Sequence, residues 1–197
     1  MTVTKVSFSF DTSLVTHHVS FPSSPPSPLS MGDTYSLEVD AAHRATLSAY
    51  HSAGHLVDSA IYRLGYDYLK PSKGYHFVDG PYVEYNNGKT MPEAERKTLP
   101  ERLNEQFAQL CNDDIPTTVC MMAKEDAEEH LNGCRLQKNF DLSAFKDPTV
   151  RIVGIAGFTC PCGGTHVASS AMLKDFEVTG IKMKKGDLRV KYGKKKP

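Results

Sequence analysis

Two short segments of this sequence carry residue types that bind metal ions. In "HSAGH", His51 and His55 are four residues apart, and in "CGGTH", Cys162 and His166 have the same spacing. Side chains four residues apart lie on one face of a helix, and the two glycines before Thr165 permit a tight turn that brings the second pair to one point. One thiolate and three imidazoles are ligands that suit tetrahedral zinc. Together the segments predict one four-ligand zinc site, with one ion per chain.

Other interpretations of these residues fit the spacing less well. The residue after His51 is Ser52, so the glutamate of the H-E-x-x-H metalloprotease motif is missing. The half-sites are more than a hundred residues apart, which excludes a zinc finger. Without a metal, the same residues would be a buried cysteine and hydrogen-bonded histidines. Cys160 comes two residues too early for the CxxxH spacing. Because on an extended strand it points the same way as Cys162, we expect it to line the pocket; the alternative is that it replaces one of the ligands.

Composition places the chain among globular proteins with one hydrophobic core. It has 197 residues, of which 40% are hydrophobic and 23% charged, as in soluble domains. The net charge is zero, so any attraction to nucleic acid must come from a local patch. No apolar run approaches the ~20 residues of a membrane helix, and the start of the chain lacks a secretory signal. The five cysteines do not have the regular spacing of a disulfide framework, which indicates a reducing compartment. We therefore expect a cytoplasmic protein with no membrane partner.

Periodic apolar positions predict the elements that carry these residues. A stripe from Leu47 to Leu64, ending at Gly65, predicts a long helix that bears both histidines. Thr98 and Glu101 have capping-box spacing and predict the start of a second helix. Because helices and strands are mixed, we predict an α+β fold with a mostly antiparallel sheet packed on the long helix. The other predicted elements are a short acidic helix at 124–131, strands at 4–10, 17–21, 34–39, 75–78, 80–86, 117–123 and 150–158, and a hairpin over 176–192.

The residues around both half-sites resemble the editing domain of alanyl-tRNA synthetases. The resemblance is carried by "VDAAHRATLSAYHSAGHLV", by "SKGYHFV" and by "VRIVGIAGFTCPCGGTHVASSAMLKDFEVTGIKM". It covers residues 33–192 and is strongest to the free-standing alanyl-tRNA editing proteins of the AlaX type. It implies an N-terminal extension with a Ser/Pro-rich loop at 1–32, a zinc-binding editing domain at 33–192 with the fold of the alanyl and threonyl editing domains, and a basic tail at 193–197.

The resemblance implies a trans-editing hydrolase that cleaves the ester between a wrong amino acid and tRNA-Ala. Serine is the expected error and glycine a second one, because a pocket built for alanine rejects neither strongly. His51, His55, Cys162 and His166 would be the zinc ligands, and the metal would either activate a water or orient the substrate. Two alternatives stay open: threonyl-type editing of seryl-tRNA-Thr, and a non-catalytic, zinc-stabilised tRNA-binding module.

The resemblance also suggests residues that meet the substrate. Gly163, Gly164 and Thr165 would lie against the aminoacyl group, where backbone N–H groups can stabilise a developing oxyanion. The alternative for Thr165 is a side chain that ties the loop to the protein. Lys73 and Cys160 would line the same pocket.

Two departures from the family pattern concern this pocket. Several family members carry Thr directly before the second zinc histidine, whereas this sequence has Gly54. Discrimination between serine and alanine is therefore either weaker here or moved to another group. A Gln near the Lys-Gly turn of synthetases has no obvious counterpart, since Ser72 precedes Lys73.

The C-terminal part is the strongly basic region of the chain. Lys182, Lys184, Lys185 and Arg189 are predicted to contact phosphates of the partner, a mischarged tRNA-Ala, in a sequence-independent and salt-sensitive way. The alternative is a solvated surface with no partner. The sequence does not decide between a monomer and a dimer.

Overall fold

The computed structural model describes residues 1–9, 11–23, 30–134, 141–143 and 145–196. The chain divides into two compact units, Met1–Glu38 and Val39–Pro197. The first holds an antiparallel hairpin of β1 (Thr2–Ser9) and β2 (Leu14–Ser20), as the alternating residues predict. The strand predicted at 34–39 is wrong, because these residues form no regular element. The Ser/Pro-rich loop falls largely on residues 24–29, outside the described residues.

A four-stranded antiparallel sheet forms one part of the second unit. Its order is β3 (Lys70–Tyr75), β4 (Tyr82–Asn86), β9 (Asp187–Lys194) and β8 (Phe176–Lys184). The predicted C-terminal hairpin is confirmed, and its turn places Lys185 and Gly186 at φ values of 53° and 94°, as the twisted two-residue hairpin turn requires. The strand predicted at 75–78 lies earlier, since β3 ends at Tyr75. The short 3-10 helix η1 (Gly88–Thr90) follows β4.

A three-stranded antiparallel sheet of order β5-β6-β7 carries the second half of the predicted zinc site. β5 is Thr118–Ala123, β6 is Thr149–Ile155 and β7 is Phe158–Pro161. The single strand predicted at 150–158 is therefore wrong: Ala156 and Gly157, at φ values of 50° and 89°, turn the chain back on itself. The predicted acidic helix is confirmed as α3 (Lys124–Cys134).

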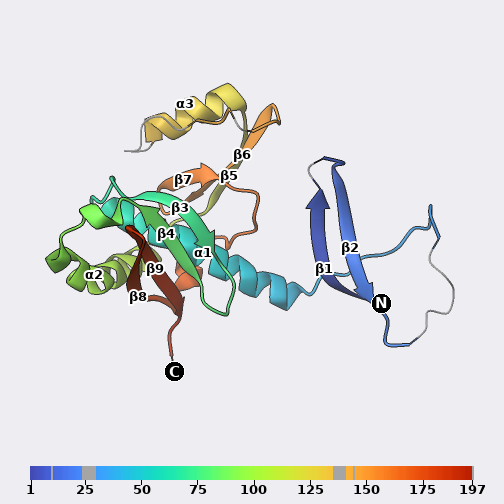
Figure 1. The fold of residues 1–197 in the computed structure, drawn as a ribbon, viewed down its shortest axis with the longest axis horizontal. Coiled ribbons are helices and arrows are strands. Elements are labelled where there is room, and N and C mark those ends of the chain that lie inside the picture. Colours follow the sequence, from blue (N-terminus) through green and yellow to red (C-terminus); the bar gives the residue numbers. More distant parts are fainter. Residues whose placement is uncertain (10, 24–29, 135–140, 144, 197) are drawn as a thin grey trace. The chain divides into compact units, whose positions relative to one another are not determined.

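The long helix α1 (Ala41–Arg63) lies at the centre of the second unit. The Asp40 carboxylate accepts the backbone N–H of His43 at 2.8 Å and caps its start, and Gly65, at φ 79°, follows its end. α1 contacts α2, β4 and β9 as well as β6 and β7; Figure 1 shows it running behind β4 and β9. Because it is covered from several sides, even the polar residues Ser52 and Ser59 are buried.

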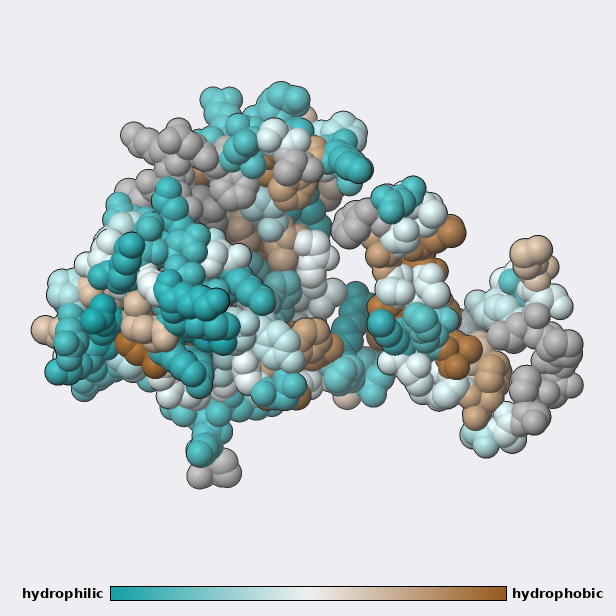
Figure 2. Space-filling model, viewed as in Figure 1, coloured by the Kyte–Doolittle hydropathy of each residue, from teal (hydrophilic) through white to brown (hydrophobic). Residues whose placement is uncertain are grey.

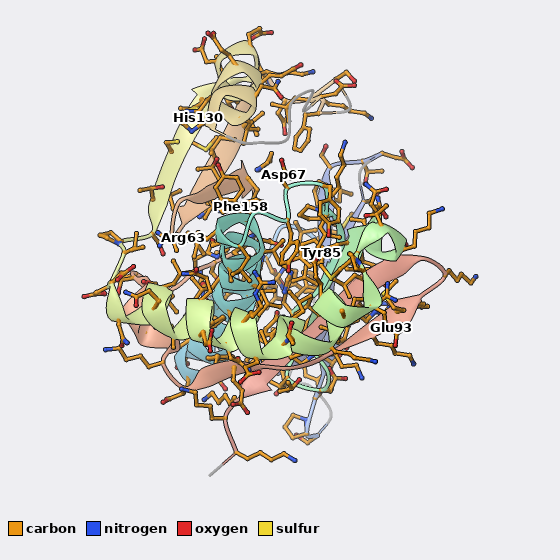
Figure 3. All side chains as sticks on the ribbon, turned by 90° about the vertical axis from the view of Figure 1, so that its left-hand side faces the viewer. Arg63, Asp67, Tyr85, Glu93, His130 and Phe158 are labelled. Atoms are coloured by element: carbon orange, nitrogen blue, oxygen red, sulfur yellow. The ribbon has the colours of Figure 1, made fainter. Side chains whose placement is uncertain are left out.

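The second helix, α2 (Glu93–Asn112), crosses α1 (Figure 3). The predicted capping box is wrong: Thr98 and Glu101 lie inside the helix, which begins after Pro92. Thr98 instead donates to the carbonyl of Glu95, and acidic residues of the first turn stabilise the helix dipole. The large apolar side chains of α2 are buried in the core, and the helix contacts the 3-10 helix η2 (Ser170–Leu173). The α+β class with antiparallel sheets is confirmed.

Candidate metal centre and its surrounding cavities

Four side chains from two distant parts of the chain converge beside α1. One potential ligand atom from each of His51, His55, Cys162 and His166 lies within 4.8 Å of the other three. The Nε2 atoms of His51 and His55 are 3.2 Å apart, and Cys162 Sγ is 3.5 Å from His51 Nε2. Ligands at the usual zinc distances on a tetrahedron would be separated by about 3.3 Å (N to N) and about 3.6 Å (S to N). This cluster can therefore hold a metal ion.

His166 supplies the clearest sign that the cluster needs a further partner. Its Nδ1 lies 3.3 Å from the Ser52 hydroxyl, which also accepts the N–H of Val167 at 3.0 Å. Its Nε2 is buried and has no hydrogen-bond partner. Such an orphaned buried nitrogen is costly unless something binds it, and a metal ion at the cluster would do so.

His55 is held by a buried carboxylate. Asp58 Oδ2 is 3.6 Å from His55 Nδ1, and Asp58 Oδ1 accepts the Tyr85 hydroxyl at 2.6 Å. Tyr85 is itself fully buried (Figure 3). A carboxylate on the outer nitrogen fixes the orientation of a metal-binding imidazole. The pair therefore turns His55 Nε2 toward the cluster.

The two cysteines have different neighbours. Cys162 Sγ belongs to the cluster, and its backbone N–H donates to the carbonyl of Arg151 on β6 at 3.0 Å. Cys160, on β7, directs its Sγ to His55 Nδ1 at 3.5 Å, on the outer side of that ring. The geometry thus separates Cys160 from the four potential ligands, as its sequence position predicts.

Burial and the neighbouring groups shift the pKa values of the cluster in opposite directions. Burial raises the pKa of Cys162, but hydrogen bonds from His51, His55 and the Gly164 N–H outweigh it and lower the pKa to about 5. Burial lowers the pKa of His55, but Asp58 and both thiols raise it well above its ordinary value. Burial lowers the pKa of His51, and it lowers that of His166 to about 4. The cluster therefore combines a thiolate with the neutral imidazoles of His51 and His166, whereas His55 must give up its proton to bind zinc.

A fourth histidine adjoins the three of the cluster, and the sequence pattern did not single it out. The His76 ring centroid is 4.8 Å from that of His51, and burial lowers the pKa of His76 to about 4. It follows β3 directly, inside "SKGYHFV". Its position after a strand that borders the site is the signal that could have found it.

Comparison with known proteins agrees with the resemblance. A family model described as "Threonyl and Alanyl tRNA synthetase second additional domain" matches residues 150–191. The alanine–tRNA ligase of Lactococcus lactis subsp. cremoris (strain MG1363) is 25% identical over 153 residues, which are 77% of this chain and 16% of the ligase. The ligases of Streptococcus sanguinis (23% over 152 residues) and Paracidovorax citrulli (27% over 155 residues) cover 77% of the chain each, and 16% and 15% of their own lengths.

Over residues 150–191 the chain is therefore similar to this synthetase domain, and over about three quarters of its length it is similar to alanine–tRNA ligases. It spans less than a fifth of the length of the ligases that it matches. The matched family segment begins on β6 and ends on β9, so it contains Cys162 and His166.

Two cavities meet at the histidines, and they divide the residues predicted to bind substrate. The His55 cavity, of about 320 Å³, is lined by His55, Asp58, Lys73, Gly74, His76 and Cys160 among others. The His51 cavity, of about 310 Å³, is lined by His51, Gly74, Tyr75, His76, Gly164 and Thr165 among others. Lys73 and Cys160 thus lie on one side of the histidines, and Gly164 and Thr165 on the other. Gly163 is exposed in the loop.

A third cavity borders His166, and a hydrogen bond at its edge shows what the Thr165 hydroxyl does. This His166 cavity, of about 550 Å³, is lined by Arg44, Ser48, Arg151, Thr165 and His166 among others. Ser48 donates to the carbonyl of Arg44 at 2.9 Å, so the 2.6 Å bond between Ser48 and Thr165 is donated by Thr165. The hydroxyl of Thr165 therefore ties the loop to α1.

The predicted tRNA-binding residues lie on the four-stranded sheet. Lys182, Lys184 and Lys185 are exposed. Arg189 instead donates to Glu84 Oε2 at 2.6 and 3.0 Å and lies 3.7 Å over the Tyr82 ring. Its guanidinium is thus largely occupied within the protein.

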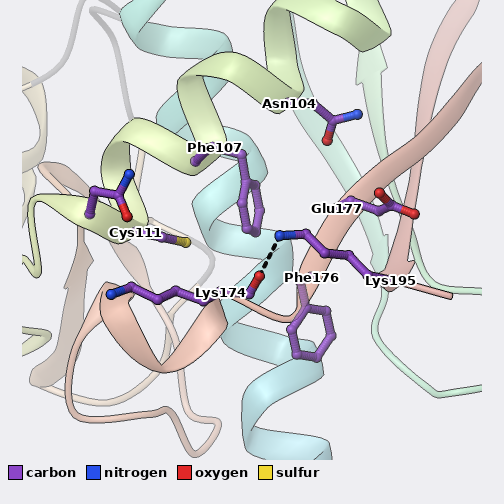
Figure 4. Close-up of a pocket in the computed structure, with 9 residues that line it drawn as sticks. Asn104, Phe107, Cys111, Lys174, Phe176, Glu177 and Lys195 are labelled. Atoms are coloured by element: carbon purple, nitrogen blue, oxygen red, sulfur yellow. Dashed lines mark hydrogen bonds between the residues drawn. The ribbon is translucent and has the colours of Figure 1, made fainter. Parts of the chain in front are cut away.

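A cavity between α2, η2 and β8 is separate from the cluster (Figure 4). Its volume is about 490 Å³, and it is lined by Asn104, Phe107, Cys111 and Lys174 among others. Lys195 Nζ donates to the carbonyl of Lys174 at 2.6 Å. Burial raises the pKa of Cys111 to about 11, so this thiol is a poor nucleophile. Among the described residues, no helix is both long and apolar enough to cross a membrane.

Proposed function

We propose that this chain is a zinc-dependent hydrolase that removes wrongly attached amino acids, serine above all and glycine as a second substrate, from tRNA-Ala in trans. The observation that carries the proposal is the cluster of three imidazoles and one thiolate at tetrahedral spacing, in a chain similar to alanine–tRNA ligases over 77% of its length. The names of those ligases describe charging of tRNA with alanine. This chain would protect the fidelity of that step.

His51, His55, Cys162 and His166 would hold the zinc ion. When bound, zinc supplies Lewis acidity beside the ester carbonyl or orients the attacking water or the amino group. Asp58 and Ser52 keep the outer nitrogens of His55 and His166 engaged, so both rings present Nε2 to one point. Such outer contacts fix the ligand geometry.

The loop after β7 would support the reacting ester. Among the described residues, no protein group accepts the backbone N–H of Gly163 or Thr165, so both donors are available to a developing oxyanion. Arg151 donates from Nη1 to the carbonyls of Cys162 at 2.5 Å and Gly164 at 2.9 Å. These two hydrogen bonds tie the loop to Arg151 on β6.

The exposed face of the four-stranded sheet would contact tRNA. Lys73, Glu84, Arg189 and Lys182 are neighbours in register across all four strands, and Figure 2 shows mainly hydrophilic residues over this sheet. The Arg189 pair neutralises Glu84, so the remaining exposed lysines give the face a positive charge. Phosphate contacts of this kind are sequence-independent and salt-sensitive.

A hydrolysis assay tests the proposal. Seryl-tRNA-Ala, glycyl-tRNA-Ala, alanyl-tRNA-Ala and seryl-tRNA-Thr would be offered to zinc-loaded protein, with Cys162→Ala as the inactive variant and Cys120→Ala, an exposed cysteine outside the cluster, as its matched control. We expect release of serine from tRNA-Ala by the wild type and by Cys120→Ala only. Cleavage of seryl-tRNA-Thr alone would establish threonyl-type editing, and tRNA binding without cleavage would establish a non-catalytic module.

A further inference from the structure

The imidazole of His76 occupies a space that two glycines leave open. A Cβ atom on Gly54 would lie 2.5 Å from His76 Cε1 and Nδ1, and 2.9 Å from the Tyr192 hydroxyl. A Cβ atom on Gly74 would overlap His76 Nε2. Contacts below 3 Å are not tolerated by close-packed side chains. Any other residue at position 54 or 74 would therefore displace this ring.

A buried tyrosine fixes the orientation of the same ring. The Tyr192 hydroxyl donates to the backbone carbonyl of Tyr50 at 3.0 Å and lies 2.6 Å from His76 Nδ1. A phenol has one proton, and here it is used on Tyr50. His76 Nδ1–H is therefore the donor to the tyrosine oxygen, and in the neutral ring Nε2 is an acceptor.

His76 lies where the His55 cavity and the His51 cavity meet. Gly74 and His76 line the His55 cavity and the His51 cavity alike, and the ring lies beside His51. His76 does not belong to the group of four potential ligands. Its Nε2 has no hydrogen-bond partner among the described residues, so this acceptor is available to a bound molecule.

We propose that His76 is the residue that recognises the side chain of the aminoacyl group, by accepting a hydrogen bond from the serine hydroxyl at Nε2. This inference rests on the proposed function and names the group that makes it selective. A seryl ester satisfies the acceptor, whereas an alanyl ester fills the same space and leaves it unpaired. Gly54 and Gly74 then contribute to substrate selectivity, because the absence of a side chain at both positions leaves room for the His76 ring.

Binding of two uncleavable probes tests the inference separately from hydrolysis. The probes are adenosines that carry L-serine or L-alanine through a 3′-amide in place of the ester, and their dissociation constants would be measured by titration calorimetry on zinc-loaded protein. We expect the wild type to bind the seryl probe about fivefold more tightly, the effect of one neutral hydrogen bond. His76→Ala should remove this preference, mainly by weakening binding of the seryl probe.

Further variants separate recognition from a purely structural role. His76→Gln, whose amide oxygen can replace Nε2 as the acceptor, should restore part of the preference. Gly54→Ala should abolish it by displacing the ring, and adding Gly54→Ala to His76→Ala should change little further. His43→Ala, an exposed histidine at the start of α1, is the matched control and should behave as the wild type.

Three results would overturn the inference: equal binding of both probes by the wild type, an unchanged preference in His76→Ala, or loss of zinc from His76→Ala, which would make the ring a metal ligand. Since the probes cannot be cleaved, a wild type that prefers the seryl probe but hydrolyses no aminoacyl-tRNA would disprove the proposed function and support the recognition by His76.

Discussion

At the scale of single residues, the cluster is organised by the groups behind its four side chains. Ser52 holds His166 and Asp58 holds His55, so both rings present Nε2 inward. Arg151 holds the carbonyl on either side of Gly163. A site arranged in this way is pre-organised, and removal of a supporting group should weaken metal binding without removing a ligand.

The different positions of the two cysteines lead to a first prediction. Cys162→Ala should lose zinc, because Cys162 Sγ lies within the cluster. Cys160→Ala should retain about one equivalent, because Cys160 Sγ faces the outer nitrogen of His55. Metal analysis of the purified variants measures both. If the two substitutions remove zinc equally, the division between the cysteines is wrong.

Asp58 gives a second prediction. Asp58→Asn keeps the shape of the side chain and removes the charge that faces His55 Nδ1. We expect zinc affinity to fall by about 10–100-fold, the usual effect of losing such a partner, in competition titrations with a chromogenic chelator. Asp67→Asn, the same change at an exposed position, is the control. An affinity equal to that of the control would mean that Asp58 serves only Tyr85.

At the scale of elements, buried serines join α1 to the three-stranded sheet and to the loop that follows β7. The Ser59 hydroxyl lies 2.6 Å from the carbonyl of Ile155 on β6 and 3.0 Å from the carbonyl of His55. Ser52 receives the N–H of Val167. Because α1 is surrounded by other elements, water does not hydrogen-bond to these buried backbone groups, and the serine hydroxyls are their partners instead. They fix how the helix half and the loop half of the cluster face each other.

Ser59→Ala should therefore lower both stability and zinc affinity. The buried carbonyl of Ile155 would lose its hydroxyl donor, at a cost of about 1–3 kcal/mol in the free energy of unfolding. Denaturant unfolding of the metal-free protein measures this change.

Substitution of Thr98 by alanine tests where helix α2 begins. Thr98 lies inside the helix and is exposed, so its loss should change the free energy of unfolding by less than about 0.5 kcal/mol. A cost near ~1 kcal/mol would instead be that of an N-cap, and it would contradict the observed start of α2.

At the scale of the whole molecule, the cluster joins segments that are far apart in the sequence. His51 and His55 lie on α1, and Cys162 and His166 lie after β7. An ion that binds only the folded chain stabilises it by about 4 kcal/mol at a thousandfold excess over the dissociation constant. Chelation should thus lower the melting temperature by about 8–16 °C for a chain of this size.

Calorimetry with and without chelator measures this effect. His166→Ala should melt at the temperature of the chelated wild type and should respond little to added zinc. A wild type whose melting temperature is unaffected by chelation would show that the cluster holds no structural ion.

The sequence predicted much of the fold because its signals are local. The hydrophobic repeat and Gly65 identified α1, and the strand pattern over 176–192 identified the β8–β9 hairpin, since both signals depend on neighbouring residues. The same local reasoning was wrong at Thr98, where the acidic turn and Pro92 start the helix earlier. It was also wrong at 150–158, where a run of apolar residues is equally consistent with one strand or two.

For the site, the sequence by itself determined the candidate ligands, because a CxxxH and an HxxxH pair each constrain their own geometry. Only the tertiary structure decided that the pairs meet, that Asp58 and Ser52 stand behind them, and that His76 lies between Gly54 and Gly74. The physical reason is that these contacts join residues from different elements. The distances between these residues depend on how α1 packs against two sheets. No local pattern in the sequence predicts that packing.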